Sequence, residues 1–160
     1  MACRQLEDFR TANLGQEPSH ISQQETTRSW EKPLEGWFKV NCDAAVDNKN
    51  GRLGLGIIVR DHMGHVRAAQ RLTKMGYIES TAVEALAMIQ GARLCKDLDI
   101  QNIILEGDAQ VIISAIQNGG QLGSRWGHLV DDVHTTLKDC LNWKVCYVNR
   151  DNSICCTRFG

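Results

Sequence analysis

The chain between residues 36 and 74 alternates apolar with polar positions at the period of two that is typical of β-strands. A turn sequence at 47–51 ends in Asn-Gly, which is a strong hairpin signal, and a second turn sequence lies at 61–64. Because short turns join antiparallel neighbours, the pattern predicts an antiparallel meander of three strands. We expect these strands over residues 36–46, 51–60 and 65–74.

The spacing of apolar residues changes to that of helices and buried strands after residue 80. A helix expected over 81–96 is apolar nearly all round, which predicts burial on more than one side. Three strands followed by helix, strand, two helices and strand predict an α/β fold, with a five-stranded mixed sheet and helices packed on it. The later elements are a strand over 102–105, helices over 109–117 and 124–140, and a last strand over 143–148.

The length of 160 residues and the hydrophobic content of 42% suit one domain with a hydrophobic core. Residues 1–28 are rich in Gln, Glu, Ser, Thr and Arg and show little apolar periodicity. Such a segment buries too little apolar surface to offset the entropy lost on ordering. We therefore predict a disordered N-terminal extension over residues 1–28 and a folded domain over residues 29–160.

The net charge of −1 gives the chain no overall basic character, so a nucleic-acid partner must be held by a local patch. Seven cysteines without CxxC spacing favour reduced thiols over a disulfide framework or a zinc site. Reduced thiols indicate an intracellular location, with nucleus and cytoplasm both open. The sequence shows neither a secretory signal nor a run of the about 20 apolar residues that a membrane helix needs, so we expect no membrane partner.

Three acidic residues interrupt segments that otherwise belong to the predicted core. Asp43 lies inside the first strand, Glu84 near the start of the first helix, and Asp108 at the end of the fourth strand. Each has a local explanation that stays open. Asp43 could bond nearby backbone at a strand end. Glu84 could close a capping box with Thr81, and Asp108 could cap the helix that follows it.

The same three acids also suit a shared metal site. Carboxylates brought together repel one another unless a cation lies between them. Oxygen-only ligands favour a hard ion such as Mg²⁺ or Mn²⁺. A pair of such ions activates water and stabilises the leaving oxygen in phosphodiester hydrolysis. We therefore predict Asp43, Glu84 and Asp108 as metal ligands and catalytic residues, with two ions in the site.

Four motifs in unbroken order carry a family resemblance: GWFKVNCDAA at 36–45, GLGIIVRD at 54–61, AVEAL at 82–86 and LEGDAQ at 105–110. Over about residues 30–155 the chain resembles the ribonuclease H-like domain of plant retroelement-derived, reverse-transcriptase-type proteins. The resemblance implies a ribonuclease H fold and hydrolysis of the RNA strand of an RNA–DNA hybrid. It also implies that Asp43 bridges both ions, and that Glu84 and Asp108 occupy the positions of two further metal-binding acids of the family.

The chain departs from the family at its fourth carboxylate, which follows the last strand and begins a last helix. Alignment of Asn152 with the family's Asn puts Cys156 at the position of the acid, and alignment without a gap puts Thr157 there. Neither side chain is a good Mg²⁺ ligand, and Asp151 would substitute only if its loop folded back. We also expect the last helix to be cut short. Reduced activity and reduced stability are expected consequences.

We expect the protein to be a monomer and its partner to be an RNA–DNA hybrid. A protein distinguishes RNA from DNA through the 2′-hydroxyls, which lie in the wide minor groove of the duplex. In the family geometry the glycine-bearing second strand would lie near that groove. The candidate nucleic-acid-binding residues are Asn41, Gly54, Gly56 and Arg60. Three functions stay open: a metal-dependent ribonuclease H-type endonuclease, a hybrid-binding module or retroelement remnant without turnover, and a protein-interaction domain that reuses the fold.

Overall fold

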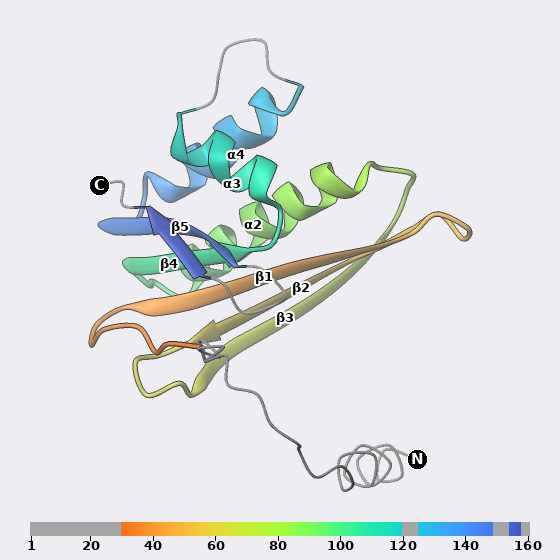
Figure 1. The fold of residues 1–160 in the computed structure, drawn as a ribbon. Coiled ribbons are helices and arrows are strands. Elements are labelled where there is room, and N and C mark those ends of the chain that lie inside the picture. Colours follow the sequence, from red (N-terminus) through yellow and green to blue (C-terminus); the bar gives the residue numbers. More distant parts are fainter. Residues whose placement is uncertain (1–29, 120–124, 149–153, 158–160) are drawn as a thin grey trace, which may run out of the picture.

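One mixed β-sheet carries helices on one of its faces in the computed structural model, which describes residues 30–119, 125–148 and 154–157 (Figure 1). The strand order is β3-β2-β1-β4-β5-β6. The pairs β1–β2, β2–β3 and β5–β6 are antiparallel, and the pairs β1–β4 and β4–β5 are parallel. The predicted α/β fold, a mixed sheet whose first three strands are antiparallel, is confirmed. Over the described residues the sheet has six strands rather than the predicted five, because β6 adds to β5 at its edge.

The described elements follow the predicted order. The strands are β1 (Phe38–Asp47), β2 (Arg52–Arg60), β3 (Val66–Met75), β4 (Asn102–Gly107), β5 (Asn142–Val148) and β6 (Ile154–Thr157). The helices are α2 (Ser80–Asp97), α3 (Gln110–Gln117) and α4 (Gly127–Leu137).

The period-two pattern of β1 and β2 separates a core face of the sheet from an open face. Val40 and Cys42 of β1 are buried with the apolar side chains of β2, against which α2 packs. Because neighbouring side chains along a strand point to opposite faces, the alternate residues lie on the side away from the helices. We call this side the open face; it includes Lys39, Asn41, Asp43, Gly54, Gly56 and Arg60.

α2 packs closely against β1 at Gly91. A Cβ at this position would lie 2.6 Å from Cys42 Sγ and 3.1 Å from Val40 Cγ1. Glycine permits this approach, although it is less favourable than alanine in a helix by about 1 kcal/mol. α2 also contacts β2 and β4, as its apolar character on nearly all sides predicted. The close packing fixes the helix that carries Glu84 relative to the strand that carries Asp43.

The end of the chain differs from the expectation. The sequence predicted a shortened last helix after the final strand, but Ile154–Thr157 form β6, which pairs with β5. The prediction of a helix is therefore wrong for these four residues. A helix of four residues hardly stabilises itself, whereas pairing with β5 supplies backbone hydrogen bonds, and β-branched residues such as Ile154 and Thr157 favour strands.

Some expectations fall on residues that the structure does not describe. The predicted N-terminal extension over residues 1–28 lies outside the described residues, so the domain boundary at residue 29 stays a prediction. Among the described cysteines, Cys42, Cys95 and Cys140 are free thiols. None of the helices in the described ranges has both the length and the apolar character needed to cross a membrane.

Candidate metal centre

The carboxylates of Asp43, Glu84 and Asp108 come together at one end of the paired part of β1 and β4. Each residue offers one ligand oxygen, and these oxygens all lie within 4.8 Å of one another. Asp43 is exposed and the other two residues are partly buried, so the cluster is open to solvent. The structure thus brings together the three acids that the sequence singled out, while their roles as ligands and catalysts stay a prediction.

The strand topology explains why the three acids meet. β1 and β4 are paired in parallel as far as Asn41 and Glu106, and Asp43 and Asp108 each lie two residues further along the chain. Because the carboxyl ends of parallel strands lie at the same edge of a sheet, both acids reach the same region. α2 begins at Ser80 and brings Glu84 to this region from its second turn.

The local explanations for two of the acids do not fit the observed helix ends. The N-cap residue of α2 is Glu79, so Thr81 lies inside the helix and is not the cap of a capping box with Glu84. The N-cap residue of α3 is Ala109, which follows Asp108, so Asp108 is not the N-cap residue of this helix. A shared site is therefore the better account of Glu84 and Asp108.

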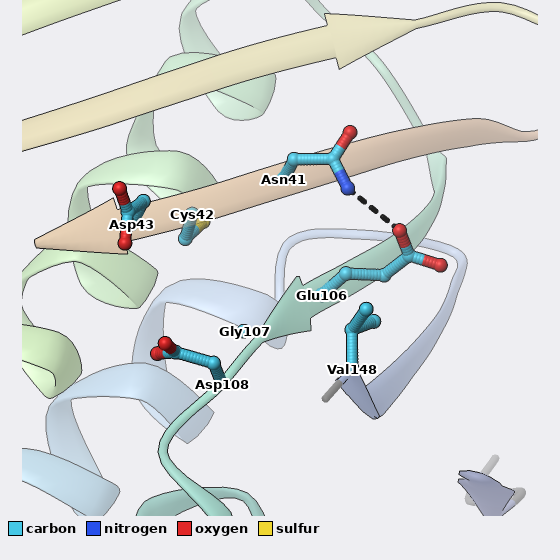
Figure 2. Close-up of a pocket in the computed structure, with 7 residues that line it drawn as sticks. All are labelled: Asn41, Cys42, Asp43, Glu106, Gly107, Asp108 and Val148. Atoms are coloured by element: carbon cyan, nitrogen blue, oxygen red, sulfur yellow. Dashed lines mark hydrogen bonds between the residues drawn. The ribbon is translucent and has the colours of Figure 1, made fainter. Parts of the chain in front are cut away.

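A pocket of about 260 Å³ lies beside the cluster. A water molecule takes about 30 Å³ of liquid, so the pocket has room for several waters or a hydrated cation. Figure 2 shows Asp43 and Asp108 on one side of the pocket and Glu106 with Asn41 on the other. The remaining lining residues are Cys42, Gly107 and Val148.

A largely buried polar network that the sequence did not predict adjoins the cluster. Glu106 is only 1% exposed, and its Oε2 accepts a 2.7 Å hydrogen bond from Asn41 Nδ2. Its Oε1 lies 2.9 Å from Lys39 Nζ, close enough for an ion pair, although the contact lacks hydrogen-bond geometry. The sequence holds one signal for this network, which is that Glu106 interrupts the apolar run 103–107. The sequence does not show that β1 is the strand beside Glu106.

Cys42 lies on the core side of β1, behind the cluster. Burial raises the pKa of the Cys42 thiol, and the nearby Cys95, Glu84 and Glu106 raise it further. The thiolate is the form that binds metal, so a thiol kept protonated does not compete with the carboxylates for a cation. Cys42 therefore belongs to the hydrophobic core rather than to the site.

The two glycines among the candidate nucleic-acid-binding residues lie on the open face. Gly56 is the partner of Asp43 across the β1–β2 pair, and Gly54 is the partner of Ala45. A Cβ at Gly56 would lie 3.9 Å from the Asp43 carbonyl oxygen, and a Cβ at Gly54 would lie 4.0 Å from the Leu72 carbonyl oxygen. These are ordinary contacts, so close backbone packing does not require glycine at either position.

The other two candidates, Asn41 and Arg60, already have partners within the protein. Asn41 donates its hydrogen bond to Glu106, and the Arg60 guanidinium carbon lies 5.7 Å from the centroid of a Trp30 ring. Both residues lie on the same face of the sheet as Asp43. Their contact with nucleic acid stays a prediction.

The donor set fits a hard divalent cation. Within the described residues, the groups that could share a metal ion are the three carboxylates of the cluster. Carboxylate oxygens are preferred ligands of Mg²⁺ and Mn²⁺, and a cation relieves the repulsion among three negative charges. The positions aligned with the family's fourth acid, Cys156 and Thr157, lie on β6, which contains no acidic residue. Asp151 and Asn152 lie outside the described residues.

Comparison with known sequences places most of the chain in one family. The family is described as reverse transcriptase-like, and its sequence model matches residues 41–158. No curated protein matches the chain. The plant and retroelement origin that the resemblance implied stays a prediction.

Solved structures that share the fold include three ribonucleases H. RNase H1 of the archaeon Halobacterium salinarum NRC-1 aligns with a TM-score of 0.65 and 19% identity, over 72% of this chain and 87% of that chain. The N-terminal RNase H domain of a Mycobacterium tuberculosis protein aligns with a TM-score of 0.64 and 14% identity, over 71% and 83%. LC11-RNase H1, isolated from compost and solved in complex with an RNA/DNA hybrid, aligns with a TM-score of 0.61 and 13% identity, over 72% and 88%. With a ribonuclease H fold and a family match over most of its length, the chain belongs to the reverse transcriptase-like family.

Proposed function

We propose that the protein is a metal-dependent endonuclease that hydrolyses the RNA strand of RNA–DNA hybrids. The observation that carries the proposal is the cluster of Asp43, Glu84 and Asp108, whose ligand oxygens lie within 4.8 Å of one another. The cluster borders an open pocket in a ribonuclease H fold. A fold neighbour, LC11-RNase H1, is solved with an RNA/DNA hybrid, which supports the same class of substrate.

The three acids would hold two Mg²⁺ or Mn²⁺ ions. When bound, such ions polarise the phosphate, lower the pKa of water and stabilise the leaving oxygen. Asp43 is the exposed member of the cluster, which suits the bridging role that the resemblance implies for it. The close packing of α2 on β1 at Gly91 holds Glu84 and Asp43 in place, and ligands held in advance need little reorganisation during the reaction.

Cleavage of a labelled RNA–DNA hybrid by the full chain, in Mg²⁺ or Mn²⁺, tests the proposal. We expect cuts within the RNA strand and none in the DNA strand. Asp43→Asn removes a charged ligand and should lower the cleavage rate by at least about 100-fold, the usual scale for loss of one preorganised electrostatic group. Asp131→Asn is the matched control, because Asp131 is an exposed acid on α4, and it should leave the rate unchanged. Cleavage that Asp43→Asn does not reduce would count against the proposal.

A hybrid-binding module without turnover is the second candidate. The observation in its favour is β6, where Cys156 and Thr157 occupy the positions aligned with the family's fourth carboxylate. Three carboxylates hold a second ion less firmly than four, because fewer ligands and less negative charge surround it. Salt-dependent binding of the hybrid without cleavage, equal in wild type and Asp43→Asn, would select this candidate.

A further inference from the structure

A polar network of the buried Lys39 and Glu106 with the partly buried Asn41 joins β1, which carries Asp43, to β4, which Asp108 follows. We propose that this network, here called the β1–β4 clamp, sets the separation of these two carboxylates and thereby the affinity of the site for divalent ions. The inference rests on the proposed metal site. Asn41 and Glu106 are positioning residues in it, because they act through the strands rather than by touching the ion.

The clamp lies at the last residue pair of the β1–β4 ladder. Asn41 and Glu106 are partners in this ladder, and the pairing ends with them. Their 2.7 Å side-chain hydrogen bond therefore ties the strands together at the point where backbone pairing stops. Each acid lies two residues further on, so a change in strand spacing at the clamp passes directly to Asp43 and Asp108 (Figure 2).

Lys39 keeps the charge of Glu106 away from the cluster. Glu106 is 1% exposed and Lys39 is 5% exposed, and a buried charge is costly unless an opposite charge accompanies it. Glu106 lines the same pocket as Asp43 and Asp108, so an unpaired Glu106 would add a like charge beside the cluster. Figure 2 shows the Glu106 carboxylate turned away from both acids and toward Asn41. The ion pair thus holds Glu106 in the orientation that the clamp needs.

Trp30 supports the clamp from the segment that precedes β1. The Lys39 ammonium lies 5.2 Å from the centroid of the Trp30 ring, and the Arg60 guanidinium contacts the same side chain. A cation over an aromatic face is attracted to it, and more strongly where water is excluded. Lys39 is therefore held by the Trp30 ring as well as by Glu106, which fixes the position of its charge.

The Mn²⁺ affinity of the full chain, measured by isothermal titration calorimetry, tests the clamp. Asn41→Ala removes the link between the strands, and Glu106→Gln leaves the Lys39 charge buried without its partner. Each should weaken Mn²⁺ binding by about tenfold or more, the usual effect of removing a group that orients metal ligands. Adding Lys39→Met to Glu106→Gln makes the pair neutral at similar volume, so it should recover most of the lost affinity.

Ile103→Val is the matched control, because Ile103 is fully buried on β4 and pairs with Phe38 at the other end of the ladder. It should lower the melting temperature and leave Mn²⁺ affinity within about twofold of wild type. The proposal is overturned if Asn41→Ala binds Mn²⁺ as tightly as wild type, or if Ile103→Val loses as much affinity as the clamp variants. A wild type that binds Mn²⁺ but cleaves no hybrid contradicts the proposed nuclease alone, because the titrations still test the clamp.

Discussion

Cys42 and Cys95 show how burial controls side-chain chemistry behind the candidate metal site. Burial raises the pKa of Cys95 to about 12, with a smaller contribution from Cys140, and burial is also the main cause of the raised pKa of Cys42. Because the thiolate is the reactive form, both thiols are protonated and unreactive at pH 8. We expect iodoacetamide to modify them at least about 100-fold more slowly in the native chain than in urea, as measured by peptide mass spectrometry.

Cys140 is the internal control for this labelling experiment, because its thiol is only partly buried and its pKa is raised mainly by that burial. In the native chain Cys140 should react faster than Cys42. In urea the two cysteines should react at the same rate. Equal rates for Cys42 in native chain and urea would mean that α2 does not cover β1 as closely as the contact at Gly91 indicates.

The acids of the cluster could be predicted from the sequence, but the clamp could not. Asp43, Glu84 and Asp108 each interrupt an apolar segment, and an acid in such a position needs an explanation that a single sequence can suggest. Glu106 also lies in an apolar strand, yet its partners Lys39 and Asn41 occupy alternate positions that look solvent-facing by period alone. Lys39 is nevertheless buried, and its contacts with Glu106 and with the Trp30 ring are non-local contacts that periodicity does not contain.

At the scale of elements, Gly91 decides how closely α2 approaches β1. Alanine is favoured over glycine in a helix by about 1 kcal/mol, but a Cβ here would lie 2.6 Å from the buried Cys42 Sγ. Overpacking a filled core costs about 1–3 kcal/mol, so we expect this steric cost to exceed the gain in helix propensity. We expect Gly91→Ala to lower the free energy of unfolding by up to about 2 kcal/mol, as measured by urea denaturation.

Cys42→Ala in the same chain removes the sulfur that the new methyl group would meet. The double variant should therefore be more stable than the sum of the single effects predicts, by about 0.5 kcal/mol or more. Simple additivity, or a Gly91→Ala chain more stable than wild type, would contradict the close α2–β1 packing.

The elements with a strong apolar period were predicted within a few residues. The helix expected over 81–96 is Ser80–Asp97, and the strand expected over 143–148 is Asn142–Val148. α4 is shorter than the expected 124–140, at Gly127–Leu137. β6 could not be predicted, because its four residues depend on pairing with β5 rather than on a periodic pattern of their own.

At the scale of the whole molecule, the two faces of the sheet differ in what they can offer a partner. The helices cover the core face (Figure 1). The open face carries Asp43 of the cluster and cations such as Arg71. Arg71 of β3 is exposed, and it is the partner of Gly56, which in turn is the partner of Asp43. The three residues therefore form one row across the open face, with a positive charge at the edge of the sheet and the acidic cluster at its centre.

The net charge of −1 means that hybrid binding must depend on a few such cations rather than on the overall field. We expect hybrid affinity, measured by fluorescence anisotropy in EDTA between about 50 and 200 mM KCl, to fall with salt at a log–log slope of about −2 to −4, which corresponds to a few phosphate contacts. Arg71→Ala should weaken binding and reduce the size of this slope by about 1. Arg93→Ala removes an exposed arginine from α2, on the helical side, and should change neither quantity. Equal effects of the two substitutions would mean that the hybrid does not lie along the open face, since only Arg71 shares a row with Asp43.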